Sequence, residues 1–111
     1  GHTRLMEIAE VREDTYAEHL HRGIGLYLVA TELLGTDKDV QKLLVRASAE
    51  LKEAQTLRPD DGRVAWYLYL VWQKLDQPRP AEKCLRKASA EVAFSSFTPA
   101  ETRELALAAR R

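Results

Sequence analysis

The chain has little cysteine, glycine or proline. Its 111 residues include one cysteine, five glycines and four prolines. The single cysteine, Cys84, excludes an intrachain disulfide and favours a reducing, cytoplasmic compartment. No apolar run reaches the roughly 20 residues that a membrane-spanning helix needs, because Thr31 and Glu32 interrupt the longest candidate, residues 24–34. We therefore expect a helical domain without a membrane span.

The chain also lacks an excess of charge of either sign. It carries 17 basic and 17 acidic residues, with no clustered stripe of lysine and arginine, so nucleic-acid binding is not expected. The charges are nevertheless graded along the chain. Residues 1–34 hold 3 basic and 6 acidic residues, whereas residues 79–111 hold 7 and 4. Such a gradient is either a solvated surface or a basis for head-to-tail contacts between copies.

Patterns that support catalysis or metal binding are missing too. We find no glycine-rich phosphate loop, no paired catalytic carboxylates and no nucleophile elbow. His19 and His21 are two positions apart, whereas two ligands on one helical face need a separation of three or four. Cys84 has no nearby pattern of histidine or aspartate, and we interpret it as a packed small side chain. We expect a protein that is not an enzyme and needs no cofactor or metal.

What the chain does contain is a near repeat of itself. The segment Leu-Tyr-Leu-Val at 26–29 returns 42 positions later at 68–71. Residues 42–51 return 41 positions later at 83–92, with six of the ten aligned pairs identical. Self-similarity at this spacing is typical of a helical hairpin used twice, in which each copy buries its apolar face on the other.

Local signals in the first half predict two helices and a turn. Residues 4–13 have helical apolar spacing and form either a short lead helix or the first turns of the next helix. Thr15 and Glu18 have the spacing of a capping box and predict a helix start, with the helix running to about residue 34 and ending at Gly35. Residues 39–57 follow the 3.6-residue period of an amphipathic helix, and 58–62 form a turn in which Asp60 or Asp61 caps the next helix.

The second half contains one ambiguous segment. Residues 64–72 are nine consecutive apolar or aromatic residues, which also suit a buried strand. A helix is favoured because the matching segment 26–29 lies in a helical pattern and a strand would have no partner. Pro80 then suits the first turn of a helix over 81–94. Thr98 and Glu101 form a second capping box around Pro99, which opens a last helix ending near residue 109.

The second helices carry a recognisable set of spacings. The small residue Ala47 is followed four positions later by the bulky Leu51. Another small residue, Ala54, comes three positions after that, and Pro59 closes the turn. The first three recur 34 residues on at Ala81, Leu85 and Ala88, and Leu68 and Trp72 match the apolar and aromatic positions of a first helix. On these residues, the segment 15–94 resembles the tetratricopeptide-repeat (TPR) family of helical hairpins. It departs from the family at Tyr27 and Tyr69, where glycine or alanine is usual.

The resemblance implies an all-α fold, a right-handed stack of antiparallel helical hairpins with flanking helices at both ends. We divide the single domain, residues 1–111, into a lead segment or helix (1–14), hairpin one (15–58), hairpin two (62–94) and a C-terminal capping helix (98–110). Tyr27, Tyr69 and Trp72 are expected in the core, because the first helices are apolar nearly all round.

The resemblance also implies a concave groove, lined by the first helices, that binds a peptide or a partner helix. The groove-facing positions of hairpin two would be Arg63, Trp66, Leu70 and Gln73. Trp66 suits a binding anchor, while Arg63 and Gln73 suit hydrogen bonds to a ligand. Alternatively, Trp66 and Leu70 pack on the N-terminal helix or the C-terminal lid.

We therefore predict a protein–protein interaction module. The alternatives are a self-association domain of a larger protein that forms a homo-oligomer, and a chaperone-like holder of an aggregation-prone helix.

Overall fold

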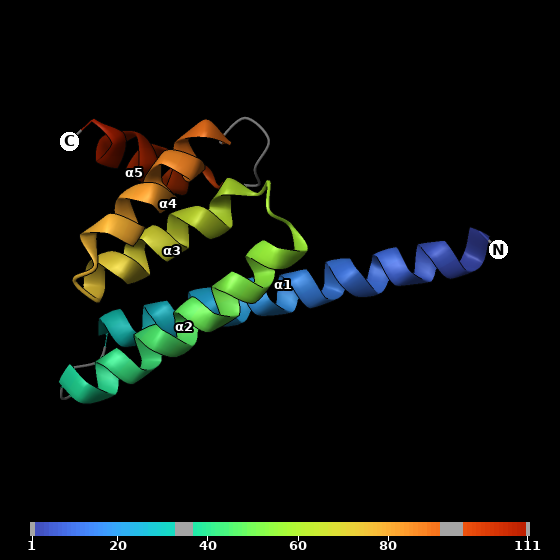
Figure 1. Cartoon of the computed structure of the whole chain (residues 1–111), viewed down its shortest axis with the longest axis horizontal. Helices are drawn as coiled ribbons and strands as arrows, with labels where there is room; N and C mark the ends of the chain where they lie inside the picture. The colour runs from blue at the N-terminus through green and yellow to red at the C-terminus, as the bar shows by residue number, and fades with distance from the viewer. Residues whose placement is uncertain (1, 33–36, 92–96, 111) are drawn as a thin grey trace.

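The computed structural model describes residues 2–32, 37–91 and 97–110, and for residues 2–14 and 37 it describes the backbone alone. Over these residues the chain is all-α, without a strand (Figure 1). The helices are α1 (His2–Glu32), α2 (Asp37–Leu57), α3 (Gly62–Lys74), α4 (Pro78–Ala90) and α5 (Pro99–Ala109). The all-α class is confirmed, and so is the helix over residues 64–72, which lies within α3. No described helix has the length and apolar character needed to cross a membrane.

The helix start predicted at Thr15 is wrong. Helix α1 runs without interruption from His2 to Glu32, so residues 2–14 are its first turns and not a separate lead helix. The physical reason is that residues 4–13 contain good helix formers and neither glycine nor proline, so nothing in them ends a helix. Extending an existing helix is also easier than starting a new one. The stop predicted at Gly35 lies outside the described residues.

Two other predicted boundaries need adjustment. Helix α4 begins at Pro78 rather than Ala81, because proline at the first helical position has a favourable φ and gives up no intrahelical hydrogen bond. The same helix ends at Ala90 instead of Phe94, and the backbone N–H of Glu91 closes it on the carbonyl oxygen of Lys87 at 3.1 Å.

The predicted caps of α3 and α5 are confirmed. The carboxylate of Asp61 accepts a hydrogen bond from the backbone N–H of Arg63 at 3.0 Å and so caps α3. In α5, the hydroxyl of Thr98 accepts from the backbone N–H of Glu101 at 3.1 Å. The Glu101 carboxylate accepts in return from the backbone N–H of Thr98 at 2.9 Å. Both helices therefore begin where the sequence predicts.

The helices pack in consecutive pairs. Helix α1 lies along α2 and α3 lies along α4, while α2 contacts α3 and α5 contacts α4 (Figure 1). One core cluster joins α1, α2 and α3 and includes the fully buried Leu44, Leu51 and Val64. A second cluster joins α3, α4 and α5 around Trp66 and Leu105. Helix α3 is thus shared between both clusters, which explains why its sequence is apolar nearly all round.

Close approach of α1 and α2 depends on a glycine. A Cβ atom at Gly23 would lie only 2.7 Å from Cγ of Leu51, so any larger residue would collide with the opposite helix. The aromatic residues expected in the core are buried to different degrees. Tyr69 is buried, whereas Tyr27 and Trp72 are half-buried at the edges of the clusters.

Candidate functional site

A groove of about 570 Å³ lies between α1, α3 and α5. Each of these three helices contributes one side of it. The lining residues are Tyr27, Leu28 and Thr31 from α1, Trp66, Tyr67, Leu70 and Lys74 from α3, and Thr98, Ala100, Glu101 and Glu104 from the start and middle of α5. No described residue of α2 or α4 lines it.

The middle of the groove is apolar and partly open. Leu28 is 50% exposed although it is a large aliphatic side chain, and Leu70, which lines the groove from α3, is half-buried. The rings of Tyr27 and Tyr67 meet edge to face, with their centroids 6.3 Å apart. Burial raises the pKa of Tyr27, and the nearby carboxylate of Glu104 raises it further. The groove therefore offers apolar and aromatic surface with an acidic residue beside it.

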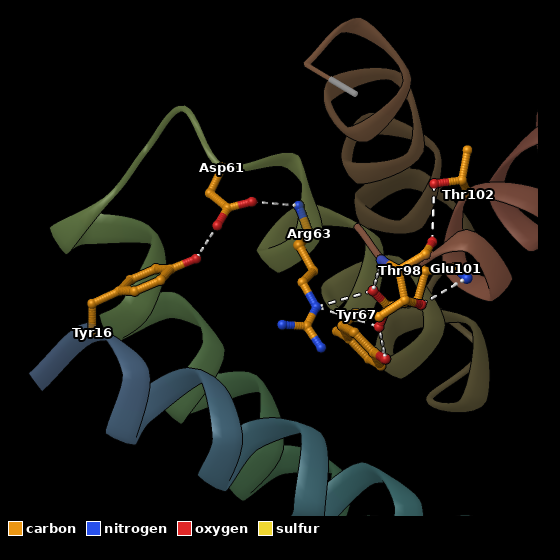
Figure 2. A network of polar contacts seen from close by, with 7 residues as sticks. All are labelled: Tyr16, Asp61, Arg63, Tyr67, Thr98, Glu101 and Thr102. Atoms are coloured by element: carbon orange, nitrogen blue, oxygen red, sulfur yellow. Dashed lines mark hydrogen bonds and ion pairs between the residues drawn. The ribbon is translucent and has the colours of Figure 1, made fainter. Parts of the chain in front are cut away.

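The carboxylate of Glu101 ties α5 to α3 at one end of the groove (Figure 2). Nε of Arg63 donates to both of its oxygens, at 3.0 and 3.3 Å, and the hydroxyl of Tyr67 donates to it as well. Glu101 is only 7% exposed. Burial acts to raise its pKa, but the Thr98 backbone N–H, the Tyr67 hydroxyl and the Arg63 guanidinium outweigh burial, so the pKa of Glu101 falls below its usual value. Glu101 is therefore a buried, ionised clamp.

A second contact ties α1 to the turn before α3. The hydroxyl of Tyr16 donates to the carboxylate of Asp61, the same group that caps α3 (Figure 2). Burial, followed by this hydrogen bond, raises the pKa of Tyr16. The guanidinium of Arg58 lies over the Tyr16 ring, 5.0 Å from its centre. Together with the Glu101 clamp, this contact fixes α1 and α5 on either side of α3.

The four predicted site residues do not all face the groove. Trp66 and Leu70 line it, but Trp66 is 2% exposed and stacks on Tyr69 with ring centroids 5.3 Å apart, in the cluster that includes Leu105 of α5. Arg63 points to the Glu101 carboxylate and is not part of the lining. Gln73 lines a separate small cavity of about 220 Å³ at the end of α3. The structure therefore brings together only Trp66 and Leu70.

The sequence prediction missed the residues from α1 and α5. For α1 the repeat contained the signal: Leu28 and Thr31 lie 42 positions before Leu70 and Gln73, so transferring the predicted positions from hairpin two to hairpin one identifies both. For α5 no such signal existed. Glu101 lies 38 residues from Arg63, and nothing in the local pattern of either segment pairs them.

One polar atom near the groove has no hydrogen-bond partner in the described part of the chain. The indole N–H of Trp66 is buried, and no hydrogen-bond acceptor reaches it among the described residues. A buried donor without an acceptor costs about 1–3 kcal/mol.

A scan against protein-family models, a search of curated proteins and a search of solved structures each give no match for this chain. Its function is therefore inferred from the geometry of the groove.

Proposed function

We propose that this chain is a TPR-like protein–protein interaction module that holds an extended peptide or a partner helix in the groove between α1, α3 and α5. The main support is that Leu28 and Leu70, equivalent positions of the two repeats, line the same groove. A stack of hairpins produces this arrangement, because equivalent faces of successive first helices then lie next to each other.

The chemistry of the lining suits recognition of a polypeptide. Leu28, Leu70 and the Tyr27 ring provide apolar surface for anchor side chains, while Thr31, Lys74 and Glu104 provide polar groups that can orient a main chain. The most strongly engaged polar groups of the region, Arg63 and Glu101, are paired with each other. They hold the groove in shape, and we assign them no catalytic role.

Two neighbouring residues of α1 provide a matched test. Leu28 and Val29 are both 50% exposed, but only Leu28 lines the groove. Peptides would be selected from a random phage-displayed library against the unmodified protein, and their dissociation constants measured by fluorescence anisotropy. We expect Leu28→Asp to weaken the selected peptides about tenfold or more, because it places a charge in the apolar part of the site. Val29→Asp should change affinity by no more than about twofold.

The same pair of variants tests what fills the groove. Equal binding by both variants, or a library that yields no binders, would contradict the proposal. If Leu28→Asp instead lowers the sedimentation coefficient of the free protein while Val29→Asp does not, the groove is occupied by a second copy and the function is self-association. Trp66 is less suitable for substitution, because truncating a buried tryptophan typically costs about 3–5 kcal/mol and would unfold part of the domain.

A further inference from the structure

A second and larger cavity, of about 860 Å³, lies between α2 and α4 over α3. Its volume is within the range of roughly 300–1,000 Å³ that is usual for ligand sites. Leu68, Trp72 and Cys84 contribute its apolar floor. Leu68 is buried, whereas Trp72 and Cys84 are half-buried and therefore accessible from the cavity. Because α2 and α4 do not line the groove described above, this cavity is a separate feature of the molecule.

Three lysines surround this floor. Lys52, Lys83 and Lys87 line the cavity, and its described lining contains no aspartate or glutamate. Nζ of Lys52 lies 5.0 Å above the centre of the Trp72 ring. Burial raises the pKa of the Cys84 thiol, while the charges of the same three lysines act to lower it. All three ammonium groups therefore act on the same small region of surface.

The positive charge is poorly compensated within the protein. Lys87 pairs with Glu91 at 3.2 Å, but within the described residues Lys52 and Lys83 form no ion pair. Neither has an acidic residue three or four positions away on its helix, and Lys83 and Lys87 are themselves four apart. Like charges at this spacing destabilise a helix. An anionic group bound in the cavity would relieve that repulsion.

We propose that this cavity is a second docking site, which binds an acidic segment of a partner protein that carries a bulky apolar anchor. The anchor would contact Trp72 and Cys84, and its acidic neighbours would contact the lysines. The cavity extends along residues 80–87, about two turns of α4 or roughly 10 Å, and along residues 52–59, which are the end of α2 and the start of the turn after it. This length matches a short stretch of peptide laid between α2 and α4. Charge complementarity would mainly increase the association rate and the specificity of binding.

Short synthetic peptides test the proposal directly. Each has a central leucine or tryptophan flanked by glutamates, by glutamines or by lysines, and binding is followed by the NMR signals of the two indole N–H groups. The glutamate-flanked peptides should shift the signal of Trp72 rather than that of Trp66, at concentrations of about 1 mM or below. Glutamine-flanked and lysine-flanked peptides should bind several-fold more weakly, and added salt should weaken the acidic peptides most.

Charge reversal identifies the site. Lys52→Glu/Lys83→Glu should weaken the acidic peptides about tenfold or more, because two attractive contacts become repulsive. The control Lys38→Glu/Lys42→Glu makes the same change in net charge at exposed positions of α2 outside the cavity, and should change affinity by no more than about twofold. Leu28→Asp should have no effect, which separates this site from the proposed groove.

Several outcomes would overturn the proposal. They are no binding of any acidic peptide, equal binding of the glutamine-flanked peptides, equal weakening by the two double variants, or loss of binding in Leu28→Asp. A fifth is that decanoate, a small anionic amphiphile, binds as tightly as the acidic peptides and displaces them. The occupant would then be a small molecule and not a protein segment.

Discussion

The same substitution at two glycines of α1 is expected to have opposite effects on stability. A Cβ atom at Gly23 would lie 2.7 Å from Cγ and 2.8 Å from Cδ2 of Leu51, and 3.4 Å from the carbonyl oxygen of Ala47. A Cβ atom at Gly25 would have nothing within 4 Å. Since Leu51 is fully buried on α2, it has little room to move away. The two positions therefore differ in packing, while sharing a helix interior.

The magnitudes follow from two opposing terms. Alanine is more favourable than glycine inside a helix by about 0.5–1 kcal/mol, and this gain applies at both positions. Overpacking a core costs about 1–3 kcal/mol and applies only at Gly23. We expect Gly25→Ala to raise the free energy of unfolding by about 0.5–1 kcal/mol and Gly23→Ala to lower it by up to about 2.5 kcal/mol. The difference between the variants measures the collision itself, because helix propensity cancels.

Urea denaturation followed by far-UV circular dichroism measures both variants under the same conditions. A third variant, Gly23→Ala combined with Leu51→Ala, checks the cause. Truncating Leu51 destabilises the protein, but once it is truncated, Gly23→Ala should cost nothing further. If Gly23→Ala stabilises the protein as much as Gly25→Ala does, the close contact between Gly23 of α1 and Leu51 of α2 is refuted.

Two further predictions concern the carboxylates. Glu101→Ala should lower the free energy of unfolding by about 2–4 kcal/mol in urea titrations, because it removes a helix cap and leaves Arg63 and Tyr67 without their acceptor. Glu104 is exposed, so Glu104→Ala should change the free energy of unfolding by no more than about 0.5 kcal/mol. Equal losses in the two variants would contradict the stabilising role of Glu101. The hydrogen bond to His19, which is the main cause, lowers the pKa of Glu50. A lowered folded-state pKa gives stability that is present above the unfolded value of about 4.3 and is lost as pH falls through the folded value. Glu50→Gln should therefore flatten the acid side of a plot of unfolding free energy against pH, and an unchanged acid side would show that this contact adds nothing.

Local signals were sufficient to predict most of the secondary structure. The capping residues Asp61, Thr98 and Glu101 all act as their spacing suggests, because a cap involves only neighbouring residues. The box at Thr15 failed because the same residue types are tolerated inside a helix, and the uninterrupted helical pattern before them decided the outcome. A capping pattern is therefore reliable only where something also ends the preceding helix.

The groove was harder to predict than the helices. Leu70 could be assigned from the resemblance, and Leu28 from the internal repeat, because both depend on periodicity. The contribution of α5 depends on the contact between Arg63 and Glu101, which is tertiary and leaves no trace in either segment alone. The burial of Trp66 has the same origin, because α5 belongs to the cluster in which it is buried.

The small buried face of α5 has a consequence for motion. Helix α5 buries only Glu101 and Leu105 of its own side chains, and these two contribute all of its fully buried contact with the rest of the protein. Local opening of α5 should thus require less free energy than global unfolding. Native-state hydrogen exchange would then show the amides of α5 exchanging well before those of α2 and α3, and during each opening a wide aromatic surface is briefly uncovered.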